Sequence, residues 1–131
     1  VIAQGTDLFG ALTELAEDCQ ALVLLPDPLV LQRGMLQNFF LHTYRLKNPV
    51  LAYSAPLATS GALLALYATP AQLGDDAASW IGESWSRGTF RLGPPRYPKH
   101  FSISVNRTVA RSLGIDLPSE ETLVRQLEAM P

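Results

Sequence analysis

The sequence predicts an α/β fold, a three-layer sandwich built on a mostly parallel sheet. Short apolar runs of strand length alternate along the chain with longer segments of helical periodicity, and this alternation is typical of parallel sheets with right-handed crossovers. The runs at residues 21–25 and 49–53 contain no alternating polar positions, as expected of strands covered on both faces. A chain of 131 residues is long enough for one compact domain but too short for two good cores. We therefore predict a single domain over residues 1–131.

Apolar spacing and turn residues predict the elements of the first half of the chain. These are a strand end at 1–3, a helix to about residue 17, a strand at 21–25, a helix at 30–46 and a strand at 49–53. Thr6 is suited to cap the first helix, and the prolines on either side of Asp27 stop the strand that follows it. The small residues at 54–61 predict a loop.

The second half is predicted from caps and breakers as much as from periodicity. Its elements are an apolar run at 62–67, a helix at 70–88, an irregular connection at 93–100, a strand at 101–105 and helices at 107–113 and about 119–130. Thr69 and Pro70 open the first of these helices. Asn106 caps the next helix, and Gly114 ends it.

Composition excludes several classes of protein. The formal net charge is −2, whereas nucleic-acid binders of this size usually carry a basic surplus. The longest apolar stretches fall well short of the roughly 18 residues that a membrane span needs. Cys19 is the only cysteine, so neither an intrachain disulfide nor a thiolate zinc cluster can form. We expect no metal and no cofactor.

Signals for catalysis are weak, and we predict that the chain is not an enzyme. The sequence contains no glycine-rich phosphate loop and no nucleophile elbow. His42 lies on the apolar stripe of its helix and is interpreted as a packed histidine, and His100 as a surface residue. Asp76 and Glu83, with Asp75, lie on one helix and are interpreted as solvated charges.

The carboxyl ends of the apolar strands carry the most informative residues, because ligands of open α/β sheets bind there. Asp27 and Pro28 follow one run, Tyr53 and Ser54 follow the next, and Tyr67 ends a third. The Asp27 carboxylate would suit a cationic group such as an ammonium, although capping of the next helix explains it equally well. Ser54 could hydrogen-bond and Tyr53 could stack on a ring, and loop packing explains both nearly as well.

Four segments, taken in order, resemble one family. They are ALVLLPDPLV (21–30), NPVLAYS (48–54), GALLALYATPAQLG (61–74) and FSISVNRTVARSLGIDLP (101–118). The last fits the closing motif of that family at Asn106, Thr108, Ala110, Leu113, Gly114, Ile115 and Pro118. The sequence is similar to the ABC-transporter substrate-binding proteins often described as tryptophan/tyrosine transport components.

The resemblance implies a type I periplasmic-binding-protein fold, in which two α/β lobes joined by crossing strands close over a small organic ligand. This chain would be the C-terminal portion without the first lobe, and residues 62–100 would be a hinge-crossing segment. Ligand binding would fall to the matching positions Asp27, Pro28, Tyr53, Ser54 and Tyr67. The implied role is noncatalytic uptake in the periplasm, with an ABC permease as the partner of the full-length protein. Without the first lobe we expect weak binding, and either one compact domain or a homodimer that exchanges elements.

Two other functions stay open at this point. The same fold could serve as the extracytoplasmic sensing domain of a histidine kinase or another receptor. A small enzyme or a receiver-like domain is the third possibility. Receiver domains need several acidic residues at strand ends, whereas Asp27 is the only strand-end carboxylate of this chain.

Overall fold

The structure is a computed structural model that describes residues 8–28, 30–86, 89–91 and 93–130. The chain divides into two compact units: unit 1 consists of Val1–Leu66 and Ile103–Pro131, and unit 2 consists of Tyr67–Ser102. The chain therefore leaves unit 1 once and returns to it once. The predicted strand end at 1–3 and the Thr6 cap lie outside the described residues. The single domain over 1–131, with 62–100 as a hinge-crossing segment, stays a prediction.

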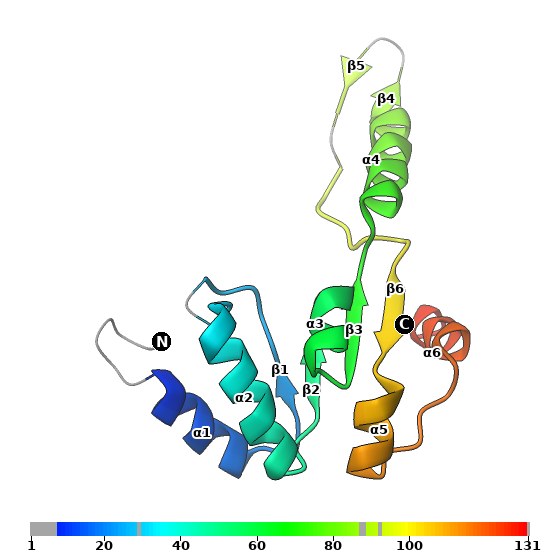
Figure 1. Cartoon of the computed structure of the whole chain (residues 1–131). Coiled ribbons are helices and arrows are strands. Elements are labelled where there is room, and N and C mark those ends of the chain that lie inside the picture. The colour runs from blue at the N-terminus through cyan, green and yellow to red at the C-terminus, as the bar shows by residue number, and fades with distance from the viewer. Residues whose placement is uncertain (1–7, 29, 87–88, 92, 131) are drawn as a thin grey trace. The chain divides into compact units, whose positions relative to one another are not determined.

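A four-stranded sheet forms the centre of unit 1, with the strand order β1-β2-β3-β6. The strands are β1 (Leu22–Val23), β2 (Val50–Ala52), β3 (Leu64–Tyr67) and β6 (Ser102–Val105). β1 pairs with β2 and β2 pairs with β3 in parallel, and β6 runs opposite to β3 at the edge (Figure 1). The predicted α/β fold with a mostly parallel sheet is confirmed.

Helices cover both faces of this sheet and give the three layers. They are α1 (Leu8–Asp18), α2 (Arg33–Arg45), α3 (Ala55–Ser60), α5 (Arg107–Leu113) and α6 (Glu120–Glu128). The core consists of alternate positions along the strands, together with residues of α1, α2, α3 and α5. Its buried apolar residues are Ala16, Leu22, Leu24, Phe39, Phe40, Val50, Ala52, Leu57, Ala58, Ala62, Leu63, Ala65 and Ala110. The intervening strand positions, among them Leu51 and Leu64, line a groove with α6, so α6 lies on the opposite face.

The predicted loop at residues 54–61 is wrong, because most of it forms the helix α3. Pro56 lies in its first turn, where the missing N–H costs no hydrogen bond. Leu57 and Ala58 are buried, so tertiary packing outweighs the turn-forming tendency of the small residues around them. Gly61 ends the helix with a φ of 145°, a conformation that favours glycine.

The expectation that the strand at 21–25 is covered on both faces is also wrong. Leu22 and Leu24 are buried, but the side chains that alternate with them, Val23 and Leu25, are each 68% exposed. β1 is the first strand in the sheet order, and one of its faces is largely open in this chain.

Local capping chemistry sets the ends of the C-terminal helices as predicted. The Asn106 side-chain oxygen accepts hydrogen bonds from the backbone N–H groups of Thr108 and Val109, each at 3.1 Å. Gly114 follows α5 with a left-handed φ of 70°. Ser119 caps α6 by accepting from the N–H of Thr122.

Unit 2 contains the helix α4 (Pro70–Ser84) and a short antiparallel ribbon of β4 (Trp85–Ser86) and β5 (Thr89–Phe90). Thr69 and Gln72 form a reciprocal capping box at the start of α4. The predicted extension of this helix to Gly88 is wrong, because β4 begins at Trp85; Gly88 itself lies outside the described residues. Residues 93–100 form the predicted irregular connection. Across the residues that the structure describes, every helix is too short or too polar to span a membrane.

Candidate functional site

The register of β1 and β2 brings two predicted ligand positions to one edge of the sheet. Leu22 pairs with Val50 and Val23 with Leu51, and the Leu24 N–H donates to the Leu51 carbonyl oxygen at 2.8 Å. Asp27 lies three residues after Leu24, and Ser54 lies three residues after Leu51. Because the strands are parallel, both tips lie at the same edge of unit 1. We call Asp27, Pro28, Tyr53 and Ser54 the strand-tip site.

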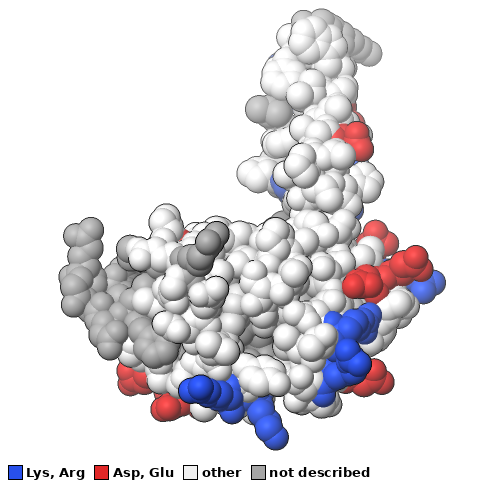
Figure 2. Space-filling model, viewed as in Figure 1, with Lys and Arg blue, Asp and Glu red and all other residues white. Residues whose placement is uncertain are grey.

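Asp27 and Pro28 lie exposed in the turn between β1 and α2. The Asp27 carbonyl oxygen accepts a hydrogen bond of 3.0 Å from the Leu31 N–H, which closes this turn. The N-cap residue of α2 is Gln32, so the alternative in which Asp27 caps this helix does not hold. The visible charged side chains of unit 1 gather at the lower edge, near α1 and α2, and on the side formed by α5 and α6 (Figure 2).

Tyr53 and Ser54 are half-buried and connect β2 to α3. Ser54 is the N-cap residue of α3, with φ −150° and ψ 146°, yet its side chain makes no capping hydrogen bond. Its carbonyl oxygen accepts from Leu57 N and Ala58 N instead. The Ser54 hydroxyl is therefore not committed to the helix it precedes.

Tyr67 is the last residue of β3 and the first residue of unit 2. It lies where the chain leaves unit 1 and is not among the residues that the register of β1 and β2 brings to one edge.

An apolar groove of about 550 Å³ adjoins the strand-tip site within unit 1. Tyr53 is shared by the two features, and Tyr53 and Gln126 supply the polar side chains of the lining. From α6 the groove also receives Leu123 and Leu127, and Met130 lines it just beyond the end of that helix. The prediction from sequence missed this groove, although the spacing of these three residues is that of one apolar helix face.

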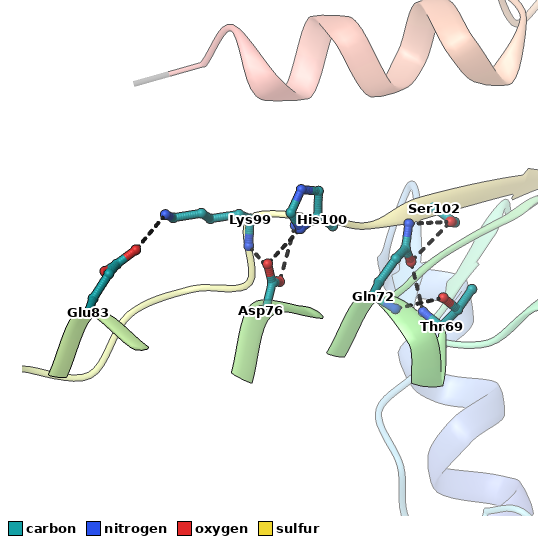
Figure 3. Close-up of polar contacts among 7 residues, drawn as sticks. All are labelled: Thr69, Gln72, Asp76, Glu83, Lys99, His100 and Ser102. Carbon is teal, nitrogen blue, oxygen red and sulfur yellow. Dashed lines mark hydrogen bonds and ion pairs between the residues drawn. The ribbon is translucent and has the colours of Figure 1, made fainter. Parts of the chain in front are cut away.

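Unit 2 carries a polar cluster that was also missed. The side chain of Asp76 contacts His100, Glu83 contacts Lys99, and Gln72 contacts Ser102 (Figure 3). Asp76 and Glu83 are predicted from sequence to be solvated charges, without these partners. His100 is predicted to be a surface residue, and its side chain is 60% exposed. The partners in each pair lie 16 to 30 positions apart in the chain, so local spacing contains no signal for them.

The pKa values of both carboxyl groups in this cluster are lowered. For Asp76, desolvation raises the pKa, but hydrogen bonds from His100 and Lys99 together outweigh it. For Glu83, the hydrogen bond and charge of Arg96, with the charge of Lys99, lower the pKa. Both groups therefore act as fixed anions near neutral pH.

Metal binding has no candidate within the described parts of the chain, where no three His, Cys, Asp or Glu side chains converge. The strand-tip site offers one carboxylate, one phenol and one hydroxyl. Such a set can bind and orient a small molecule by charge, stacking and hydrogen bonding.

Comparison with known proteins establishes a likeness of fold. Neither a protein-family model nor a curated protein matches this chain. The crystal structure of a conserved domain protein from Vibrio cholerae matches with a TM-score of 0.58 and 24% sequence identity. The match covers 91% of this chain and 39% of that chain, so this chain spans about two fifths of the length of the solved protein. The two proteins are similar in fold, and at this identity the likeness shows the fold alone.

Proposed function

We propose that this chain binds a small organic solute without chemical conversion, as part of a solute-binding protein that serves an ABC transporter. The observation that carries the proposal is the register of β1 and β2, which brings Asp27 and Ser54 to the same edge of unit 1. Ligands of open α/β sheets bind beyond the carboxyl ends of the strands.

The chemistry of the strand-tip site favours a ligand with a cationic group and a flat apolar part. The exposed Asp27 carboxylate suits an ammonium group. Tyr53 offers a half-buried ring for stacking, and the Ser54 hydroxyl can donate or accept one hydrogen bond. An aromatic amino acid or a related amine combines these features.

The resemblance to ABC-transporter substrate-binding proteins supports the same proposal. That family carries crossing strands between two lobes, and here the chain leaves unit 1 after Leu66 and returns at Ile103, through the neighbouring strands β3 and β6. A periplasmic location and an ABC permease as partner rest on this resemblance. The resemblance implies that a second lobe closes the site, so we expect the 131-residue chain alone to bind weakly.

Thermal-shift screening tests the proposal. The 131-residue chain, and any longer natural polypeptide that contains it, would be screened with L-tryptophan, L-tyrosine, the other amino acids and aromatic amines. A ligand at 100 times its Kd should add about 2.7 kcal/mol to the free energy of unfolding. The proposal fails if no solute of this class shifts the melting temperature of either polypeptide.

A further inference from the structure

Residues 93–101, which we call the return segment, lie along α4 within unit 2, and the Asp76 carboxylate of α4 makes several hydrogen bonds to them. The Oδ2 atom of Asp76 accepts hydrogen bonds from the backbone N–H groups of Lys99 at 3.0 Å and His100 at 3.2 Å. Its Oδ1 atom lies 2.6 Å from Nδ1 of the His100 ring (Figure 3). The Asp76 side chain is 15% exposed, so three contacts converge on a partly shielded carboxylate.

A second set of contacts holds the same segment further along α4. Glu83 pairs with Arg96 at 2.7 Å and with Lys99 at 3.5 Å. The Arg96 guanidinium lies over the Trp80 ring, 5.1 Å from its centroid, in a cation–π contact. These contacts orient the return segment and involve no histidine.

Apolar packing contributes little to this attachment. Among the described residues of unit 2, none of the hydrophobic side chains is buried, and Tyr97 of the return segment is 94% exposed. A segment of this size without an apolar core depends on other links for its order. The polar contacts to α4 therefore carry much of the attachment.

His100 is the one histidine in these links, and imidazole is the side chain whose ordinary pKa lies nearest neutral pH. The charged groups that take part in these links are Asp76 and Glu83 from α4 and Arg96 and Lys99 from the return segment itself, and Asp75 precedes Asp76 in α4. Asp76 is in direct contact with the ring. An imidazole that gains a proton converts a neutral hydrogen bond to a carboxylate into a charge-assisted one, which is the stronger interaction.

We propose that Asp76 and His100 form a proton-sensitive clasp, which holds the return segment to α4 more tightly in mild acid than at alkaline pH. Asp76 stays ionised through this range, because its hydrogen bonds lower its pKa. The response thus comes from His100. The His100 side chain is 60% exposed, so solvent weakens the interaction. We therefore expect the protection of the return-segment amides to change about two- to five-fold, the magnitude seen for exposed ion pairs.

Solvent-exchange NMR of the backbone amides in the 131-residue chain tests the clasp. Protection of the Lys99 and His100 amides, corrected for intrinsic exchange, should rise two- to five-fold from pH 8 to pH 5.5. His100→Gln keeps a side-chain donor but cannot titrate, and it should abolish the rise. Asp76→Asn should lower protection at both pH values, whereas Asp75→Asn, the adjacent carboxylate on the same helix, should behave as the wild type.

The amides of Leu24 and Leu63, which bond to backbone carbonyls of β2, report whether unit 1 stays folded in each variant. Protection at Lys99 and His100 that does not change with pH in the wild type would overturn the proposal. A rise in protection at mildly acidic pH that persists unchanged in His100→Gln would overturn it as well, because the protonated group would then be a residue other than His100.

Discussion

The backbone N–H of Leu24 donates a hydrogen bond of 2.8 Å to the carbonyl oxygen of Leu51. This bond continues the parallel register of β1 and β2 to the ends of both strands. Asp27 and Ser54 follow the bonded residues at equal distances along the chain. A shift of one residue in this register would move Tyr53 to the other face of the sheet.

Asp27→Asn should weaken binding of the best-bound amine or amino acid by about 10- to 100-fold, because a hydrogen bond to a charged group contributes about 1.5–3 kcal/mol. Asp27 is exposed and does not cap α2, so the unliganded variant should remain folded. Isothermal titration calorimetry measures the change in Kd.

The matched control for this substitution is Asp116→Asn, which alters an equally exposed carboxylate between α5 and α6. It should leave the Kd unchanged. Equal losses in the two variants would point to the net charge of the chain and not to a contact at the strand-tip site.

Asn48→Ala should lower the free energy of unfolding by about 2 kcal/mol, measured by urea denaturation. Asn48 is 6% exposed, and its Nδ2 donates to the carbonyl oxygens of Ala16 and Cys19. Removing this donor leaves buried acceptors unsatisfied, at about 1–3 kcal/mol. Asn48→Asp should cost more, since it directs an anion at those oxygens. Asn38→Ala, at an exposed position of α2, is the control and should cost well under half as much.

Gly61→Ala should destabilise the chain by about 2 kcal/mol or more, a cost expected of strained or overpacked core positions. A Cβ at Gly61 would lie 2.9 Å from Cγ of the buried Phe40 ring, and the backbone φ is 145°. Gly34→Ala, in α2, meets nothing within 4 Å and should stabilise by about 0.5–1 kcal/mol. Thermal unfolding of both variants checks the contrast, and equal melting temperatures would contradict it.

The lowered pKa of Asp76 predicts a defined response to strong acid. Its ionised form is favoured in the folded chain, so its contribution to stability is present above the unfolded-state pKa and is lost as the pH falls through the lowered folded value. Carboxyl-carbon NMR should show Asp76 titrating below 3.8, the ordinary value for this group. His100→Ala should move that titration upward, because it removes one of the hydrogen bonds; an unmoved titration would mean that the backbone donors alone set the pKa.

Those parts of the fold that depend on local chemistry could be predicted from the sequence. The cap at Thr69, the cap at Asn106 and the helix end at Gly114 each involve hydrogen bonds to residues within four positions, and the apolar strands identified the parallel sheet. α3 was missed because the burial of Leu57 depends on elements far away in the chain.

The same difference between local and long-range signals holds for the functional residues. The positions of the candidate site at the strand tips follow from the topology of parallel sheets, so Asp27 and Ser54 could be named in advance. The contact of Asp76 with His100 joins residues 24 positions apart, and the N-cap position of Gln32 depends on how the turn after Asp27 folds. Neither is encoded in a local pattern.

Chemical-shift mapping with the best solute from the screen tests the central claim most directly. On titration into the isotopically labelled 131-residue chain, the backbone amides of Asp27, Tyr53 and Ser54 should show the largest changes in unit 1, with saturation at one shared Kd. Saturable changes confined to Leu127, Met130 and the apolar groove, with the strand-tip amides unmoved, would contradict the account.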